Sequence, residues 1–80
     1  MGKICGLNKL GVGECAEVLR LENKGSIRRR FFDLGIIEGS KITCVLQAPW
    51  GTPCAYLIKG AVVAIRNSDC EKVIVRCENE

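Results

Sequence analysis

The feature that most constrains this chain is a series of short strand-like runs separated by glycine, proline and asparagine residues. Five runs have this character, at residues 14–22, 41–48, 54–59, 61–66 and 72–77. The second alternates most clearly and places Ile42, Cys44 and Leu46 on one face of the expected strand. Short strands at intervals of about 8–12 residues, joined by turns, predict a mostly β chain that forms a small barrel or sandwich.

One segment between the first two runs has helical periodicity instead. Its apolar residues recur at i, i+4 and i+7, at Ile27, Phe31 and Leu34. Ser26 is placed to cap the start of this helix, and Gly35 is placed to end it in the left-handed conformation. The three arginines 28–30 lie about 100° apart around the helix, so they spread over a solvated face and make a poor phosphate-binding stripe.

The 80 residues are enough for one domain, which we expect to span residues 1–80. Residues 1–13 are expected to be a lead-in, with a short apolar spacing at Ile4, Leu7 and Leu10. The matched helix and strand periodicities predict a single core. Its expected members are Ile27, Phe31, Leu34, Ile42, Cys44, Leu46, Val63, Ile65, Val73 and Val75.

Charge and hydropathy limit the kinds of partner. The net charge of +3 comes from 12 basic and 9 acidic residues that are mixed along the chain, whereas nucleic-acid modules usually have a clustered basic face. No secretory signal is present, and the longest aliphatic run, Ala61–Ile65, is far shorter than the roughly 20 residues of a membrane helix. We therefore expect a cytoplasmic protein without membrane insertion and without a nucleic-acid partner.

Six cysteines and no histidine restrict the chemistry further. No two cysteines form a C-x-x-C pair, which structural zinc sites usually contain. Cys15, Cys44, Cys54 and Cys77 lie in apolar strand-like runs, where a free thiol behaves as a small hydrophobic residue. The expectation is six free thiols, no metal site and no cofactor, with a redox or metal role as the alternative.

Catalytic motifs are missing from the sequence. Without histidine, the commonest general base is absent and so are the Cys–His and Ser–His pairs. Residues 11–13 form a lone G-x-G without the third glycine of a dinucleotide-binding loop. We therefore predict no catalytic residues and a protein that is not an enzyme.

Three stretches carry a family resemblance. The stretches are RRRFFDLGIIEG, ITCVLQAPWGTP, and VVAIR followed by KVIVR. In order and spacing they resemble the FeoA family of small cytosolic proteins that accompany the bacterial ferrous-iron transporter FeoB. The resemblance covers about residues 7–77. It implies an SH3-like small β-barrel of about five strands with one inserted α-helix. It also implies binding to FeoB or its cytosolic GTPase portion, and modulation of transport without chemistry of its own.

The sequence departs from the family pattern at a few positions. Phe31 and Phe32 stand where the family usually has leucine, and Glu38 where it has proline. Trp50 and Thr52, at the tip of the expected hairpin, replace leucine and aspartate. The paired phenylalanines keep the apolar character of the helix, whereas the other two changes alter the hairpin tip.

A candidate partner-binding surface follows from the exposed helix face and this hairpin tip. Arg28, Arg29, Phe32 and Trp50 are its expected members, because aromatic and arginine side chains are typical interface anchors. The other interpretation is that Phe32 and Trp50 cover the rim of the barrel.

Alternatives of other classes remain at this point. The chain could be a small basic nucleic-acid-binding barrel, a free-standing relative of the C-terminal domain of iron-dependent repressors of the DtxR type, or a thiol redox protein. The residue pattern does not decide self-association.

Overall fold

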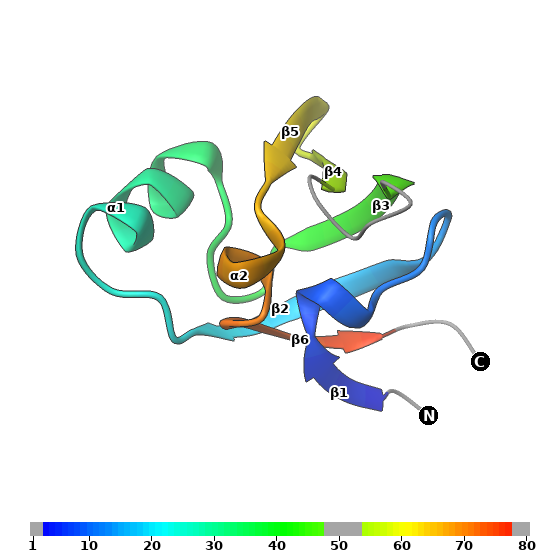
Figure 1. Cartoon of the computed structure of the whole chain (residues 1–80), viewed down its shortest axis with the longest axis horizontal. Helices are drawn as coiled ribbons and strands as arrows, with labels where there is room; N and C mark the ends of the chain where they lie inside the picture. The colour runs from blue at the N-terminus through cyan, green and yellow to red at the C-terminus, as the bar shows by residue number, and fades with distance from the viewer. Residues whose placement is uncertain (1–2, 48–53, 78–80) are drawn as a thin grey trace.

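The computed structural model describes residues 3–47 and 54–77 (Figure 1). The elements are β1 (Lys3–Gly6), η1 (Leu7–Lys9), β2 (Cys15–Leu21), α1 (Gly25–Leu34), β3 (Lys41–Gln47), β4 (Cys54–Ile58), β5 (Ala61–Ile65), α2 (Asn67–Cys70) and β6 (Val73–Cys77). The predicted mostly β fold with one inserted helix is confirmed, and the lead-in contains β1 and η1, which the count of about five strands did not include. No helix in the described residues is long and apolar enough to cross a membrane.

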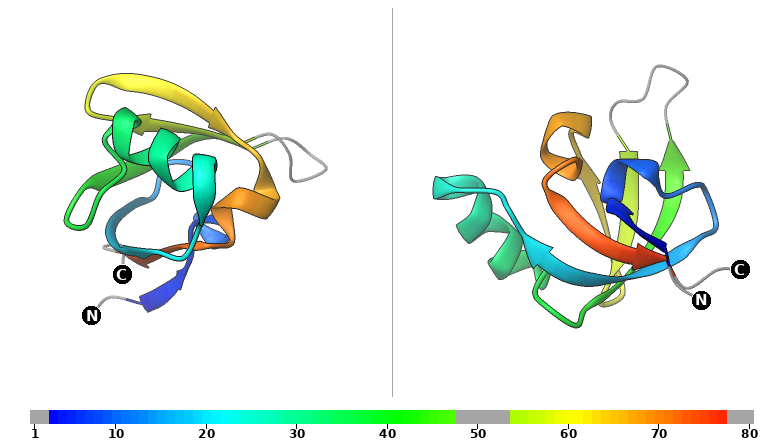
Figure 2. Two further views of the ribbon diagram at one scale, coloured as in Figure 1. Left: turned by 90° about the vertical axis from the view of Figure 1, so that its left-hand side faces the viewer. Right: turned by 90° about the horizontal axis from the view of Figure 1, so that it is seen from below.

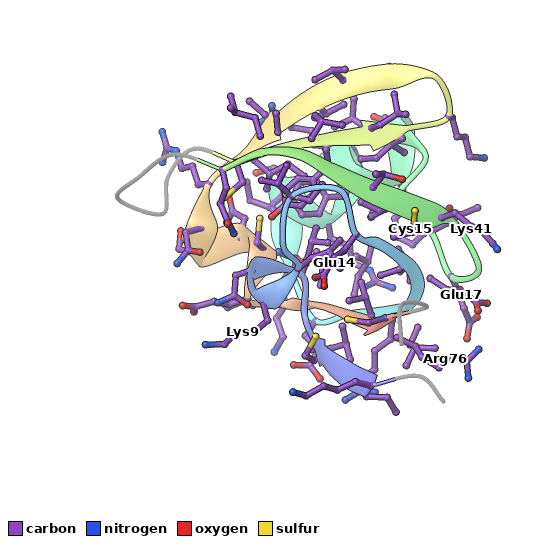
Figure 3. All side chains as sticks on the ribbon, turned by 90° about the vertical axis from the view of Figure 1, so that its right-hand side faces the viewer. Lys9, Glu14, Cys15, Glu17, Lys41 and Arg76 are labelled. Carbon is purple, nitrogen blue, oxygen red and sulfur yellow. The ribbon has the colours of Figure 1, made fainter. Side chains whose placement is uncertain are left out.

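The strands form one antiparallel sheet in the order β1-β6-β2-β3-β4-β5. The sheet curves around the core, so that β4 and β5 lie on one side of the molecule and β1 and β6 on the other (Figures 1 and 2). On the outer surface, Arg76 of β6 pairs with Glu17 of β2 at 2.9 Å (Figure 3). Helix α1 leaves the end of β2 and stands beside this curved sheet (Figure 2).

Two bulges allow the strands to bend. The pairing of β2 with β6 shifts between Val18 and Arg20, and the pairing of β3 with β4 shifts between Cys44 and Leu46. An extra residue in one strand reverses which side chains face inward beyond it. In β2 the shift turns Arg20 outward and lets Leu21 pack against the core.

The core contains most of the expected residues. Phe31, Ile42, Cys44, Ile65, Val73 and Val75 are buried, and Ile27, Leu34 and Val63 pack against them while partly exposed. The prediction that Leu46 belongs to the core is wrong, because the bulge in β3 turns its side chain outward and leaves it 59% exposed. Sequence analysis missed the buried Leu7, Leu10, Ala16, Val18, Ile36, Cys54, Tyr56, Ile58 and Cys70.

Tyr56 is the largest fully buried side chain of the described residues. Its hydroxyl oxygen lies 3.4 Å from the carbonyl oxygen of Leu7, to which it donates, and it accepts a weak bond from the thiol of Cys70 at 3.5 Å. Burial raises the pKa of Tyr56 above its ordinary value, so the phenol remains protonated and able to donate. The side chain therefore joins β4 to both η1 and α2.

Helix α1 ends as predicted and begins differently. Gly35 has φ +93°, its N–H donates to the carbonyl oxygen of Phe32 at 3.0 Å, and the Ile36 N–H donates to that of Phe31 at 2.8 Å. These two bonds form a Schellman motif, with Ile36 buried behind it. The predicted capping role of Ser26 is wrong: the N-cap residue is Lys24, and no side chain caps the helix.

Phe31→Ala tests the packing of α1 against the barrel. Phe31 is 2% exposed and Phe32 is 44% exposed. Removing the buried ring should lower the free energy of unfolding by about 3–5 kcal/mol, because the lost contacts leave a cavity. Urea unfolding measures this loss, and Phe32→Ala is the matched control, with an expected loss below about 1 kcal/mol. Equal losses for the two variants would contradict the placement of α1.

The buried thiol of Cys70 predicts a pH dependence. Burial raises its pKa from 9.0 to about 11 in the folded chain. Between these two values the thiol ionises in the unfolded chain and stays protonated in the folded one, so ionisation favours unfolding. The free energy of unfolding should therefore fall as the pH rises through this window, and it should fall less steeply in Cys70→Ala. If urea unfolding shows that the free energies of unfolding of the two proteins fall equally steeply across this pH window, the prediction is wrong.

Candidate partner-binding surface

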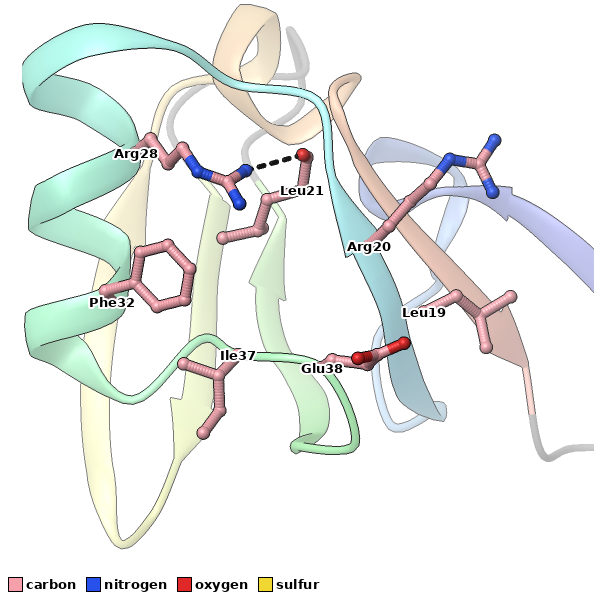
Figure 4. A pocket seen from close by; sticks show the side chains of 7 residues that line it. All are labelled: Leu19, Arg20, Leu21, Arg28, Phe32, Ile37 and Glu38. Atoms are coloured by element: carbon pink, nitrogen blue, oxygen red, sulfur yellow. Dashed lines mark hydrogen bonds between the residues drawn. The ribbon is translucent and has the colours of Figure 1, made fainter.

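A groove lies between α1 and the outer side of β2. It has a volume of about 570 Å³ and an open mouth (Figure 4). Its lining comes from β2, from α1 and from the turn after α1, at Leu19, Arg20, Leu21, Arg28, Phe32, Ile37 and Glu38. The groove is thus apolar at its base and carries charged groups of both signs at its edges.

Local backbone features shape this groove. Leu19 faces outward because Ala16 and Val18 alternate inward along β2, and the bulge turns the next residue, Arg20, outward as well. The Schellman motif sends Ile36 inward, and the next residue, Ile37, then faces outward. Ser40 fixes the turn, since its hydroxyl donates to the Gly35 carbonyl oxygen at 2.7 Å and accepts from the Ile37 N–H at 3.2 Å.

Arg28 connects the two walls of the groove. Its guanidinium donates to the carbonyl oxygen of Leu21 at 2.8 Å, and it also lies over the ring of Phe32, 4.9 Å from the ring centroid (Figure 4). The first contact satisfies a carbonyl at the end of β2, and the second is a cation–π contact. Arg28 therefore has a structural role in addition to its expected role at the surface.

Arg29 is exposed on the outer side of α1. It lines a smaller hollow of about 290 Å³ together with Gly25, Arg28 and Phe32. Within the described residues, Arg29 belongs to neither of the ion pairs Arg20–Glu22 and Arg76–Glu17. Its guanidinium is therefore available to an acidic group outside the protein.

Three of the four residues predicted for the partner surface come together here. Arg28, Arg29 and Phe32 lie next to one another on α1, and the 44% exposure of Phe32 leaves part of its ring uncovered. Trp50 lies outside the described residues. The prediction did not include the lining residues Leu19, Arg20, Leu21, Ile37 and Glu38. The Leu-Gly helix end, which turns Ile36 inward and Ile37 outward, was the available signal for Ile37.

A second exposed apolar face lies on the outer side of β3, β4 and β5. Leu57 is opposite Val62 in the sheet, and Leu46 is opposite Ala55. Val62 and Leu46 are 65% and 59% exposed, and neither has a charged residue next to it in its strand. This face is apolar but has no arginine anchor, so it is a weaker candidate for an acidic partner than the groove.

Thiols offer little to catalysis or metal binding. Burial raises the pKa values of Cys5, Cys44 and Cys70, whereas a reactive thiol needs a lowered pKa. Within residues 3–47 and 54–77, no three Cys, Asp or Glu side chains form a group that could hold a metal ion. Zinc sites usually take at least three protein ligands, so the described residues do not fit one.

Comparison with known proteins identifies relatives along nearly the whole chain. The FeoA domain matches residues 5–77. A fusion of Fe(2+) transport protein A with the Fe(2+) transporter FeoB, from Porphyromonas gingivalis, is 35% identical over 69 residues; these are 86% of this chain and 8% of that protein. An FeoA-like protein from Clostridium acetobutylicum is 29% identical, with a TM-score of 0.87 over 100% of this chain and 93% of its own.

Two further structures define the fold. FeoA from Stenotrophomonas maltophilia, described as an SH3 domain protein complexed with zinc, is 26% identical with a TM-score of 0.78, over 88% of this chain and 87% of its own. A manganese-dependent transcriptional repressor is 18% identical with a TM-score of 0.84, over 92% of this chain and 36% of its own, a likeness in fold alone. The predicted SH3-like architecture is confirmed.

The contact between Arg28 and Leu21 predicts a change in stability. Arg28→Ala removes this hydrogen bond and the stacking on Phe32, and it should lower the free energy of unfolding by about 0.5–1.5 kcal/mol. Arg29→Ala is the matched control on the same helix, and it should change that free energy by less than about 0.5 kcal/mol. Denaturant unfolding measures both, and an equal effect of the two substitutions would contradict the structural role of Arg28.

Proposed function

Because the chain belongs to the FeoA family, we propose that it is a cytoplasmic accessory protein of bacterial ferrous iron uptake, which binds the cytosol-facing part of the FeoB transporter and modulates transport. The observation that carries this proposal is the fusion protein of Porphyromonas gingivalis, in which the two parts share one polypeptide. A covalent link keeps two partners at high effective concentration and favours a weak contact between them.

The groove beside α1 is the proposed contact surface. Phe32 and the aliphatic residues at its base offer apolar area, while Arg28 and Arg29 at its edge offer groups that pair with carboxylates. Trp50 completes the surface that the sequence predicts. We propose that the transporter contributes a segment with an apolar side chain next to acidic residues.

Binding without catalysis is consistent with the chemistry of the described residues. The sequence has no histidine, and burial raises the pKa values of Cys5, Cys44 and Cys70. The groove has an open mouth, so it does not exclude water from a reacting group. A domain of this size offers roughly 600–800 Å² to a partner, which suits a reversible regulatory contact.

Titration of isotope-labelled protein with the soluble domain of the transporter tests the proposal. Addition of that domain, with and without guanine nucleotide, should shift amide resonances of α1 and of the turn after it. Saturation at micromolar concentrations is the expected result. If the transporter domain causes no shift while single-stranded RNA does, the protein belongs to the nucleic-acid-binding class instead.

Two substitutions test the surface itself. Arg29→Glu and Phe32→Ala should each weaken transporter binding about tenfold or more, as expected for interface anchors. Lys9→Glu and Leu57→Ala are the controls: Lys9 is an exposed lysine on the face of the molecule that points away from α1, and Leu57 lies on the second apolar face (Figure 3). A loss with the controls, but not with the two test variants, would move the contact away from the groove.

A further inference from the structure

Two cysteines from opposite ends of the chain lie close together. The sulfur atoms of Cys5, in β1, and Cys77, in β6, are 3.5 Å apart, although 72 positions separate the residues in the sequence. In the sheet Cys5 is opposite Val75 and Cys77 is opposite Lys3, so the two cysteines are diagonal neighbours on one face. Both are partly exposed, so a small reagent can reach them.

The other thiols of the chain are placed differently. Cys44, Cys54 and Cys70 are buried in the core. Cys15 is partly exposed, but its sulfur lies 3.2 Å from the hydroxyl oxygen of Thr43. Within the described residues, the contact between Cys5 and Cys77 is the one thiol–thiol contact in which both partners are reachable from solvent.

We propose that Cys5 and Cys77 form a reversible dithiol–disulfide pair, which a low-molecular-weight disulfide such as glutathione disulfide oxidises. The inference does not depend on the proposed transporter binding. A disulfide bond needs its sulfur atoms about 2.05 Å apart, so they must approach by about 1.5 Å. Strand β1 is an edge strand that pairs with β6 alone, and it can make this small movement without disturbing a second neighbour (Figure 1).

The exchange balances in two steps. The Cys77 thiolate attacks one sulfur of glutathione disulfide, which forms a mixed disulfide and releases one glutathione thiolate. The Cys5 thiol then loses its proton and attacks the Cys77 sulfur, which releases the second glutathione. Burial disfavours the Cys5 thiolate and raises the pKa of Cys5 to about 11, so it is the 3.5 Å distance to the Cys77 sulfur that favours this intramolecular step.

The consequence is a covalent bond between the first and last strands. It closes a loop that contains nearly the whole chain, and long loops give the largest loss of freedom in the unfolded state. The midpoint of thermal unfolding should therefore rise by about 10 °C or more on oxidation. Reduction returns β1 to its weaker attachment by backbone hydrogen bonds and side-chain packing.

Equilibration of the purified chain in glutathione buffers of graded redox potential tests the proposal. Free thiols are then alkylated, and the mass is measured before and after tryptic digestion. The expected product lacks two hydrogen atoms, and its digest joins the peptide 4–9 to the peptide 77–80. The midpoint of thermal unfolding of the same sample should rise, and Cys15→Ser should behave like the parent protein.

Several results would overturn the inference. The first is a chain that keeps six alkylatable thiols in excess glutathione disulfide. The second is a crosslink between other cysteines or between two chains. The third is an unfolding midpoint that does not change on oxidation. The variant Cys77→Ser should retain the unfolding midpoint of the reduced protein in every buffer. A rise in its midpoint on oxidation would assign the effect to another pair.

Discussion

The buried phenol of Tyr56 is the contact on which the closure of this small barrel depends. A chain of 80 residues has a thin core, so its ends must be covered by local segments instead of further layers. Leu7 and Leu10 cover one part of the core from the segment after β1, and Cys70 covers another from α2. The hydroxyl of Tyr56 contacts both segments, which explains how a polar atom can lie at the centre without an unpaired donor.

Periodicity in the sequence predicts the regular strands of this barrel, but not the bulges and short segments that close it. Turn residues bounded β4, β5 and β6, and clean alternation identified β3. It failed at Leu46, since alternation assumes a regular strand and the bulge in β3 breaks that regularity. The apolar spacing of Ile4, Leu7 and Leu10 is present in the sequence, but it is too short to identify an edge strand followed by a single 3-10 turn.

In the candidate site, too, some features could be predicted from the sequence and others could not. The helix end at Gly35 was predictable because a left-handed residue is required there, and the path of the chain beyond it follows from that constraint. The helix start was not, because the chain uses Gly25 at φ +67° and no side-chain cap, so the signal at Ser26 misled. Arg20 lines the groove because of the bulge in β2, and a bulge has no fixed residue signature.

Two neighbouring arginines of α1 have different roles. Arg28 donates one hydrogen bond to the end of β2 and stacks on Phe32, and both contacts help to hold the helix in place. Arg29, one residue further along, makes no such contact in the described structure and points to solvent. Adjacent positions on a helix diverge by about 100°, which is why neighbouring identical residues can differ in this way. A run of three arginines is therefore no uniform basic patch: one guanidinium orders the helix, and this order presents Phe32 and the next guanidinium at a fixed angle to any partner that enters the groove.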